Sequence, residues 1–553
     1  MDSAAFRVEG KKMVDLVADY WDGIRERRPL PDIKPGYIRE LVPAQAPETP
    51  EDWSKIFDDI EGVVLNGATH WHHPHFFAYF PTGLSYQSIL ADILSGGIAG
   101  IGFTWKSCPS MTELEMSSLD WLVTLLGLPE HFKNAHDGPG CGIIQSTASD
   151  STMIAIMAAR AAQVERIKNE QNGFAKWMAS TELAKTLKGI FDRVRVNKVS
   201  LWGGLESRIW VVRPGLRLRL QPPLQTQKSI HIVQDADNDA EMIVPYYHDP
   251  SVFEKFVMYC SDQAHSSVEK GAMLSGIRLR KLKATRDFLD NFGVAEHTLR
   301  TAIRQDRARG YIPFMYLATI GTTCSCGVDQ LDRLGPVCQE EQIYLHVDAA
   351  YAGTFAFCDE FKYLLNGIEH ADSYNFNLHK AGMVNFDCSP MWFKNGTNIA
   401  KFFNVDALYL AHEYQGTAAD YRHLQVALGR RFRSLKIWFV LRNMGVAKIR
   451  EYLRRTETLA KLFAELITED GRFEHFVPQH LGLTCFRLKN STTADNERLC
   501  NAINDDRRIH IVPSTVHQTY FLRMVVCSQL TNEADVVFAK NVIFEIVDRI
   551  FGQ

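Results

Sequence analysis

The sequence of 553 residues lacks an excess of charge of either sign, a pattern of paired cysteines, and any apolar run long enough to cross a bilayer. Its 61 basic and 65 acidic residues leave a net charge of −4, which gives no general attraction to nucleic acid or to an anionic membrane. The eleven cysteines are scattered and odd in number, which argues against a disulfide framework and favours a reducing compartment. We therefore expect a cytoplasmic protein that binds neither nucleic acid nor membrane.

Two further signals are missing from the sequence. Its amino-terminal residues have no uninterrupted apolar core followed by a cleavage site, and their apolar residues recur at the spacing of an amphipathic helix. Cys324 and Cys326 are close together, but no second pair and no histidine cluster completes a metal site, so no metal is expected. The expected partners are small molecules or other protein chains.

The sequence contains enough hydrophobic residues, 46% of the total, to form large hydrophobic cores. Segments with helical spacing alternate with short β-rich runs, which predicts an α/β fold with a mostly parallel sheet covered by helices. Beyond about residue 430 the pattern predicts a smaller α+β domain. Helices are predicted over 111–128, 151–167, 433–445 and 451–467, and strands over 314–323, 343–353, 481–489 and 520–528.

This pattern predicts three parts: a helical, proline-rich extension over 1–85, a large α/β domain over 86–400, and a loop with a small domain over 401–553. The segment 172–249 is basic and then acidic, and it breaks the helix–strand alternation. We expect it to be a surface insertion that is partly disordered and dispensable for the function of the predicted α/β domain.

The stretch DSYNFNLHKAGMVNFDCS carries one lysine, Lys380, among mostly apolar neighbours. Such a lysine must turn its ammonium towards water, pair it with an acid, or lose its charge. The last of these alternatives produces a nucleophilic amine.

Two other segments carry residue types that complement such an amine. Asp348 ends the strand-like run in LHVDAAYAG, where an α/β fold places ligand-binding groups, although taken alone it could be an ordinary cap or turn residue. The segment DGPGCGIIQSTASDS brings Ser146, Thr147 and Ser149 to the start of a helix. Its hydroxyls and backbone amides suit a phosphate, and simple helix capping by Thr147 or Ser149 explains them equally well.

A phosphate cradle, a carboxylate at a strand end and a partly buried lysine are together what pyridoxal 5'-phosphate (PLP) requires. The lysine forms a Schiff base with the aldehyde of PLP, the carboxylate keeps the ring nitrogen protonated, and the cradle holds the phosphate. This combination is far more specific than any of its members, so PLP is the predicted cofactor.

The segments SDQAHSSVEK, LHVDAAYAG, NFNLHK, VNFDCS and YRH…LGRRFRSLK resemble those of the aromatic-L-amino-acid decarboxylases, which are group II PLP-dependent enzymes. The resemblance covers nearly the whole chain apart from 172–249. It implies the aspartate-aminotransferase type of fold (fold type I) with a seven-stranded sheet. It also implies a homodimer with its active sites at the subunit interface.

The resemblance also implies roles for individual residues. Lys380 would be the Schiff-base lysine, Asp348 the partner of the pyridine nitrogen, His265 the ring stacked on the cofactor, and Tyr409 the proton donor on a mobile loop. The remaining cofactor-binding residues would be Thr147, Ala148, Ser149, Thr323, Asn377 and His379, and the substrate residues would be Trp71, Tyr79, Phe80, Thr82 and Phe103.

Some of these assignments have structural alternatives. The aromatic stretch WHHPHFFAYFPT fits a pocket for an aromatic substrate, but it could instead be core or dimer interface. His265 could be a core histidine with its hydrogen bonds satisfied. The cluster GRRFR at 429–433 is expected to be a solvated, salt-bridged surface without a catalytic role.

The implied reaction is decarboxylation of dopa, 5-hydroxytryptophan, tyrosine or tryptophan to the amine. Relatives that form aromatic acetaldehydes tend to carry Asn in place of His265 or Phe in place of Tyr409, and this sequence keeps His and Tyr. A non-catalytic interaction homologue is the alternative from another class, and the intact set of site residues argues against it. The sequence departs from the family at Ala381, Ala411 and Leu424, which puts substrate choice and rate in doubt.

Overall fold

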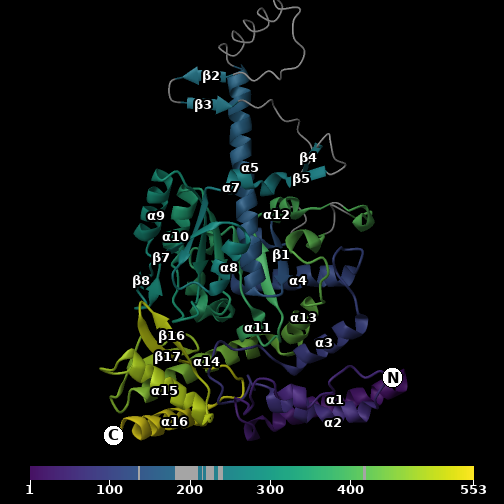
Figure 1. Ribbon diagram of the computed structural model, residues 1–553, viewed down its shortest axis with the longest axis vertical. Coiled ribbons are helices and arrows are strands. Elements are labelled where there is room, and N and C mark those ends of the chain that lie inside the picture. The colour runs from purple at the N-terminus through teal and green to yellow at the C-terminus, as the bar shows by residue number, and fades with distance from the viewer. Residues whose placement is uncertain are drawn as a thin grey trace, which may run out of the picture. The chain divides into compact units, whose positions relative to one another are not determined.

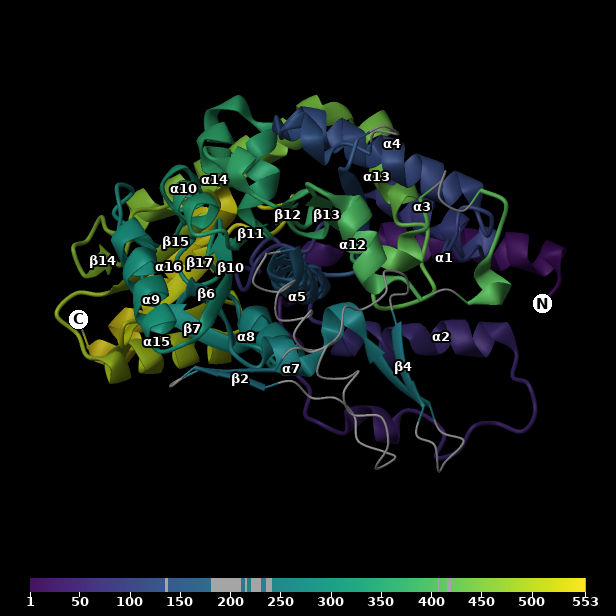
Figure 2. The same ribbon diagram turned by 90° about the horizontal axis from the view of Figure 1, so that it is seen from above.

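The computed structural model describes residues 1–134, 138–180, 210–213, 216–219, 230–234, 241–405, 407–414 and 419–552. The chain divides into two compact units, one formed by Met1–Ile156 with Val257–Gln553 and the other by Met157–Phe256. The first unit contains both principal sheets, whose strands are labelled in Figures 1 and 2.

A seven-stranded sheet forms the centre of the first unit, in the order β1-β13-β12-β11-β10-β6-β7. Strands β10, β11 and β12 are parallel to one another, and β13 is antiparallel to both of its neighbours, β12 and β1. Strand β1 therefore runs in the same direction as β12. The bounds are β1 (Cys141–Gln145), β6 (Phe256–Ser261), β7 (Arg278–Leu282), β10 (Ile312–Thr319), β11 (Tyr344–Asp348), β12 (Ser373–Asn375) and β13 (Ser389–Phe393).

The inner strands are buried almost without interruption, and only the first residue of β10 and of β11 is not fully buried. Such continuous burial is expected for parallel strands that are covered on both faces. Helices α9 (Glu296–Ala308) and α10 (Leu331–Glu340) pack against β10, and α4 (Pro109–Leu126) packs against β1. The predicted α/β fold with a mostly parallel sheet is confirmed.

Helix α4 has sequence signals at both of its ends. Pro109 occupies the first turn, where a missing N–H costs nothing, and Gly127 ends the helix in the left-handed region with φ of 71°. Helices α3 (Tyr86–Ile98) and α4 lie beside α13 (Ser434–Asn443), as both Figure 1 and Figure 2 show. The predicted helices over 111–128 and 433–445 are confirmed with ends shifted by one or two residues.

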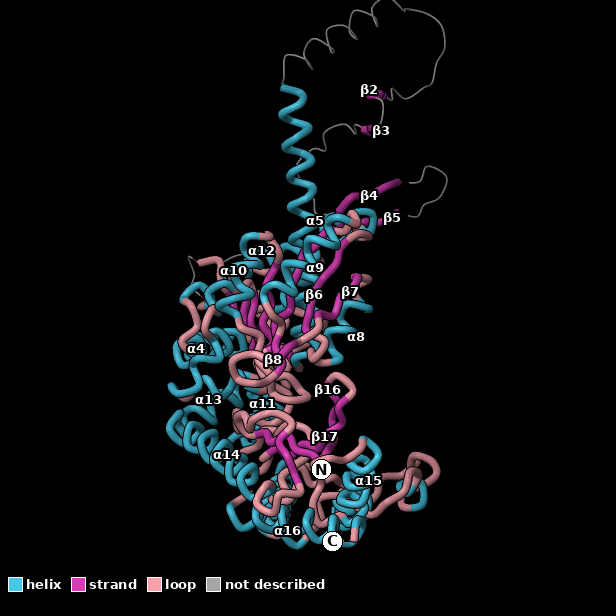
Figure 3. Tube along the Cα trace, turned by 90° about the vertical axis from the view of Figure 1, so that its left-hand side faces the viewer, coloured by secondary structure: helices cyan, strands magenta, loops and turns pink. Residues whose placement is uncertain are grey.

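The carboxyl-terminal part contains an antiparallel four-stranded sheet in the order β14-β15-β17-β16, which Figure 3 shows near helices α14 to α16. Helices α15 and α16 each begin with a capping box, at Thr492 and Asn532. The α+β pattern predicted beyond residue 430 is confirmed. The bounds are α14 (Gly445–Ile467), β14 (Phe473–His475), β15 (Leu483–Leu488), α15 (Thr493–Asp506), β16 (Val512–Val516), β17 (Thr519–Val525) and α16 (Glu533–Phe551).

The amino-terminal part contains helices α1 (Ser3–Asp22) and α2 (Trp53–Val63). The helix expected at the start of the chain is confirmed, and the side chain of Asp2 caps it by accepting the N–H of Ala5. Neither α1 nor α2 contains a fully buried residue. Both helices therefore have little core of their own.

The second unit contains the greater part of α5 (Ala148–Ser180) and the antiparallel pairs β2 (Trp210–Arg213) with β3 (Leu216–Arg219) and β4 (Ile230–Gln234) with β5 (Glu241–Pro245). The expected insertion over 172–249 thus begins inside a helix. Its predicted disorder falls largely on residues outside the described ranges, and the three-part division of the chain stays a prediction. Within the described ranges, none of the helices combines the length and apolar character that crossing a membrane requires.

Candidate active site

The predicted site residues follow the carboxyl ends of neighbouring strands. Thr147 comes two residues after β1, Thr323 lies in the turn after β10, Asp348 is the last residue of β11, and Lys380 comes shortly after β12. Because these strands run in the same direction, their carboxyl ends lie along one edge of the sheet. Ligands of open α/β sheets bind at this edge.

Lys380 lies in the short helix α11 (Leu378–Ala381). Its side chain is partly buried, and its Nζ lies 5.6 Å from the centre of the Phe80 ring. Burial lowers the pKa of the Lys380 amine, while the negative charge of Asp348 opposes this shift. The lysine predicted to be a nucleophile is therefore held in surroundings that favour the neutral amine.

Asp348 is buried at the end of β11, with only 4% of its surface exposed. Its Oδ1 accepts the backbone N–H of Ala350 at 3.1 Å, and Nδ2 of Asn375 lies at 3.5 Å from the same atom. Burial raises the pKa of the Asp348 carboxyl, and the charge of Lys380 opposes that rise. A buried carboxylate of this kind is stable only beside positive charge, which a protonated ring nitrogen supplies.

His265 caps helix α8 (Ser266–Leu274), and its Nδ1 accepts the backbone N–H of Ser267 at 3.1 Å. This hydrogen bond places the proton of the neutral imidazole on Nε2. Burial lowers the pKa of His265, the charge of Lys380 lowers it further, and Asp348 raises it. The residue is nevertheless exposed, so the alternative of a core histidine is wrong, and its pKa responds to both charged side chains.

The start of helix α5 has the geometry of an anion site. Thr147 and Asp150 form a reciprocal cap, in which the Thr147 hydroxyl donates to the Asp150 carboxylate and accepts the Asp150 N–H. Capping by Thr147 is therefore real. The N–H groups of Ala148 and Ser149 follow in the first turn, where an α-helix offers them no partner of its own.

A hydrogen-bonded link connects this helix start to the lysine segment. Ser389 in β13 donates its hydroxyl to Oδ1 of Asn377 at 2.8 Å, and its Oγ lies 3.4 Å from Oγ of Ser151 in the first turn of α5. Asn377 is the residue that precedes α11. The structure therefore brings Asn377 beside the first turn of α5, as a shared phosphate site requires.

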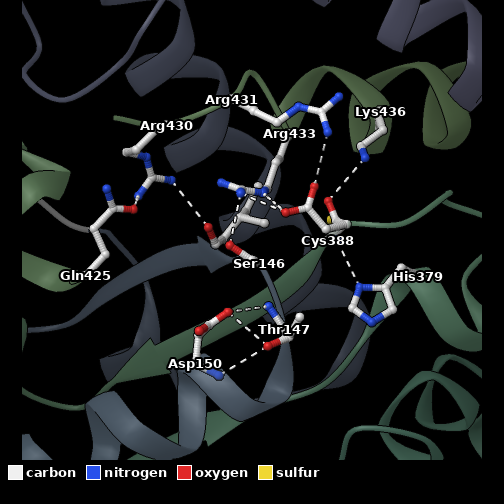
Figure 4. A network of polar contacts seen from close by, with 12 residues as sticks. Ser146, Thr147, Asp150, His379, Cys388, Gln425, Arg430, Arg431, Arg433 and Lys436 are labelled. Atoms are coloured by element: carbon white, nitrogen blue, oxygen red, sulfur yellow. Dashed lines mark hydrogen bonds and ion pairs between the residues drawn. The ribbon is translucent and has the colours of Figure 1, made fainter. Parts of the chain in front are cut away.

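His379 is fixed in a single orientation next to Lys380. Its Nδ1 accepts the backbone N–H of Cys388 at 2.9 Å, which Figure 4 shows, and its ring is buried. Burial lowers the pKa of His379 to about 3, so the imidazole is neutral and carries its proton on Nε2. That N–H is a hydrogen-bond donor that does not need a charge.

The prediction that the cluster at 429–433 is a solvated surface is wrong for Arg430 and Arg433. Both are more than nine-tenths buried. Arg433 donates to the Asp387 carboxylate at 2.7 and 2.9 Å. It also donates to the hydroxyl of Ser146 at 3.0 Å, a contact that can be followed in Figure 4. The buried guanidinium of Arg433 therefore holds Ser146, which precedes the capping residue Thr147. Neither propensity nor spacing in the sequence distinguishes Arg433 from a surface arginine.

The aromatic loop before α3 divides into two stacks. Phe80 is buried and stacks on Tyr351 at 3.8 Å between ring centres, while Tyr79 stacks on Trp71 at 5.1 Å. Arg523 lies over the Phe80 ring at 5.2 Å. Phe80 thus fits two of the predicted alternatives, the substrate pocket and the core, because it is buried and also borders Lys380.

Arg523 is a site residue that sequence reasoning missed. It is 3% exposed, it donates to the backbone oxygen of Tyr79 at 3.4 Å, and its Nε has no hydrogen-bond partner. Within the described residues it forms no ion pair. A buried, unpaired guanidinium over the same ring as Nζ of Lys380 gives this region a positive charge for an anionic ligand.

Thr82 is held against the lysine segment by its neighbour Gly83, whose N–H donates to the backbone oxygen of His379 at 2.6 Å. A Cβ added to Gly83 would lie 2.5 Å from the backbone oxygen of Val384. Only glycine therefore allows the two backbones to approach this closely.

We expect Gly83→Ala to displace the Thr82 loop, raising the KM for the amino acid substrate that the resemblance implies and lowering the free energy of unfolding by about 1–3 kcal/mol. Steady-state kinetics and urea unfolding measure the two effects. Gly10→Ala is the control, because an added Cβ there meets no atom within 4 Å, and its KM should equal that of the parent. A normal KM for Gly83→Ala would show that the Thr82 loop does not form the substrate site.

Phe103 and Tyr409 differ from the other predicted site residues in their surroundings. Tyr409 is 80% exposed in the short helix Leu408–Leu410, and the backbone oxygen of Phe103 accepts the N–H of Arg422. In the part of the chain that the structure describes, no hydrogen bond or cation–ring contact joins either residue to Lys380. The structure therefore links most of the predicted site residues to the lysine segment, and these two have no such link among the described residues.

The chain matches the model of the pyridoxal-dependent decarboxylase conserved domain over residues 35–189 and 238–489. It is 43% identical to the aromatic-L-amino-acid decarboxylase of Manduca sexta over 535 residues, which are 97% of this chain and 90% of the relative. It is 42% identical to the enzyme of the same name from Mus musculus, over 98% of this chain and 96% of that one.

Solved structures of similar proteins cover the whole chain. The structure of Catharanthus roseus tryptophan decarboxylase with L-tryptophan has a TM-score of 0.79 at 30% identity, and it covers 100% of this chain and 99% of that one. Oryza sativa TDC with PLP and tryptamine has a TM-score of 0.82 at 27% identity, with the same coverage. Rhodiola rosea 4-hydroxyphenylacetaldehyde synthase has a TM-score of 0.79 at 28% identity, again with 100% and 99% covered.

Proposed function

The chain belongs to the pyridoxal-dependent decarboxylase family, and we propose that it converts an aromatic L-amino acid to the corresponding amine and CO2 with PLP bound at Lys380. The observation that carries this proposal is the convergence of three groups at one edge of the sheet. These are the amine of Lys380, the buried carboxyl of Asp348 and the free amides at the start of α5.

The residues of the site fit PLP. The amides of Ala148 and Ser149, with Asn377 and the Nε2–H of His379, would hold the phosphate. Asp348 would pair with the ring nitrogen, and His265, exposed beside the two charged groups, would lie against the ring. Thr323, exposed in the turn after β10, would border the cofactor.

When bound, the cofactor supplies an electron sink for the pair of electrons that the departing carboxylate leaves at the α-carbon. The chain does the rest. Asp348 would keep the ring nitrogen protonated, and Lys380 would hold the cofactor and then release it to the substrate amine. Arg523 would attract the substrate carboxylate, and Tyr409 would return a proton to the α-carbon.

An aromatic substrate suits the loop that precedes α3. Phe80 and Thr82 border the lysine segment, and the stacked pair Trp71 and Tyr79 lies in the same loop. Flat apolar rings in this arrangement favour a flat side chain. The names of the relatives from Manduca sexta and Mus musculus support the same substrate class.

The active form is proposed to be a homodimer. Helix α3 packs on α13 with one face. Its exposed apolar side chains follow the i, i+4, i+7, i+8 spacing of a helical stripe, over Tyr86, Leu90, Ile93, Leu94 and Ile98. A stripe of this kind, next to amino-terminal helices without a core of their own, suits a second copy of the chain. Phe103 and Tyr409 would then complete the partner's site, which would account for the lack of a link to Lys380 of the same chain among the described residues.

We expect Leu94→Asp to shift the protein from dimer to monomer in sedimentation velocity and to lower the activity in parallel. The charge would sit in the middle of the apolar stripe. Val537→Asp, at another exposed apolar position, is the control and should leave the dimer intact. A dimeric Leu94→Asp protein would place the interface elsewhere.

Aldehyde formation is the second candidate reaction. The similarity to Rhodiola rosea 4-hydroxyphenylacetaldehyde synthase favours it, as does Ala411 beside Tyr409. The retained His265 and Tyr409 favour the amine.

The cytoplasmic location also remains a proposal, and the eleven free cysteines support it.

The direct test supplies dopa, 5-hydroxytryptophan, tyrosine, tryptophan and histidine separately to the PLP-loaded protein under air. Carbon dioxide, amine, aldehyde and hydrogen peroxide are measured together. We expect CO2 and amine in equal amounts from at least one aromatic substrate and little of either from histidine. No CO2 from any of the aromatic substrates would refute the proposed function.

A further inference from the structure

A group of polar side chains fastens the segment that carries Tyr409 to the rest of the chain. Nε2 of His412 lies 3.0 Å from both carboxylate oxygens of Asp420, and Oδ1 of Asp420 also accepts the backbone N–H of Trp105 at 3.0 Å. Arg422 approaches the same carboxylate at 4.0 Å. These four residues are called the clasp below.

The clasp is buried although the segment around it is exposed. The side chains of His412 and Asp420 are only 2% and 5% exposed. Tyr409, taken as a whole residue, is 80% exposed. Hydrogen bonds to a charged group that is shielded from water are worth more than those on the surface, so this contact fixes its residues firmly. The exposed ion pair between Lys106 and Glu413 on the same segment contributes little by comparison.

The clasp holds the segment on both sides of Tyr409. Arg422 donates through its NH1 nitrogen to the backbone oxygen of Val405 at 3.3 Å, and Val405 lies four residues before Tyr409. His412 lies three residues after it. Between these two attachments the phenol stands in solvent on a single helical turn. Its reach is therefore set by where the clasp holds Val405 and His412.

From this geometry we propose that His412 and Asp420 are positioning residues for Tyr409. His412 and Asp420 hold the end of the segment that follows Tyr409, and Asp420 also lies beside Arg422, which holds the end at Val405. In this way they determine how often the phenol protonates the α-carbon before dioxygen reaches it. The proposal rests on the proposed function, because it concerns the last step of that reaction.

The two outcomes of that step balance differently. Protonation gives one amine for each CO2. Diversion consumes O2 and H2O with the amino acid and gives the aldehyde, CO2, NH3 and H2O2, so that dioxygen takes up the two electrons as peroxide. The amine-to-aldehyde ratio therefore measures the positioning of the phenol, and it does not depend on the fraction of protein that is folded.

The experiment compares this ratio, per CO2 released under air, in the PLP-loaded parent and in variants of the clasp. We expect His412→Ala and Asp420→Ala each to lower the ratio about tenfold, because a small displacement of a reacting group has large effects. The double variant should be no worse than either single one, since the two residues act through one contact. Lys106→Ala is the control and should keep the parental ratio.

If the alanine variants do not fold, the amine-to-aldehyde ratios of His412→Gln and His412→Asn test the proposal instead. The amide nitrogen of Gln reaches the position of Nε2 and should preserve the ratio, while the shorter Asn should not. Equal ratios in these two variants, or an unchanged ratio in folded His412→Ala and Asp420→Ala, would overturn the proposal. Absence of CO2 from the parent itself would instead refute the proposed function on which it rests.

Discussion

Replacing Asp348 by alanine is expected to lower kcat for decarboxylation by about 10²- to 10³-fold, the usual effect of removing a preorganised charge from an active site. Asp348 is buried at the end of β11 beside Lys380, and it would supply the negative charge that keeps the cofactor ring protonated. The unprotonated ring is a poor electron sink. The measurement is CO2 release per mole of bound PLP, which separates turnover from cofactor loss.

Asp372→Asn is the matched control for this prediction. Asp372 precedes β12 at the opposite edge of the sheet, where its carboxylate accepts the N–H of Leu345 at 2.8 Å. Its replacement should lower stability while leaving turnover per bound PLP unchanged. Normal turnover in Asp348→Ala would contradict the role of Asp348, and an equal loss in Asp372→Asn would show that any buried aspartate near the sheet has the same effect.

Tyr409→Phe should keep CO2 release and lower the amine-to-aldehyde ratio by roughly 10²-fold, the typical contribution of a positioned general acid. The substitution keeps the ring and removes only the hydroxyl donor. The exposed position of Tyr409 means that the loss of the hydroxyl should not disturb the folded state. Aldehyde and peroxide should rise together at the expense of amine.

The same assay in the absence of oxygen is the control for Tyr409→Phe. Aldehyde and peroxide should both disappear there, since dioxygen is consumed in forming them. Tyr414→Phe, a second tyrosine on the same segment, should keep the parental ratio. An unchanged ratio with full activity in Tyr409→Phe would assign the protonation to another group.

The sequence alone identified those features that depend on local pattern. Continuous apolar runs predicted β10 and β11, and the helical spacing of apolar residues predicted α4 with each end shifted by two residues. Asp348 and Lys380 could be singled out because a charge that interrupts an apolar run has few structural explanations.

Other features depend on contacts between distant segments, which no local pattern contains. The sequence pattern around Arg433 predicts a surface cluster. In the structure Arg433 is buried against Asp387 and Ser146, because its segment packs at the start of α5. Arg523 lies in an ordinary alternating strand, and only the approach of Phe80 from a loop more than 400 residues earlier shows its importance.

The most direct test of this account is to reduce the PLP-loaded protein with borohydride and to map the labelled peptide by mass spectrometry. Borohydride fixes the cofactor permanently to the amine that holds it. We predict one pyridoxyl group per chain, on Lys380 within the segment 372–389, and its loss in Lys380→Arg. A pyridoxyl group on any other lysine, or no incorporation after incubation with PLP, would contradict the assignment of Lys380 and the function built on it.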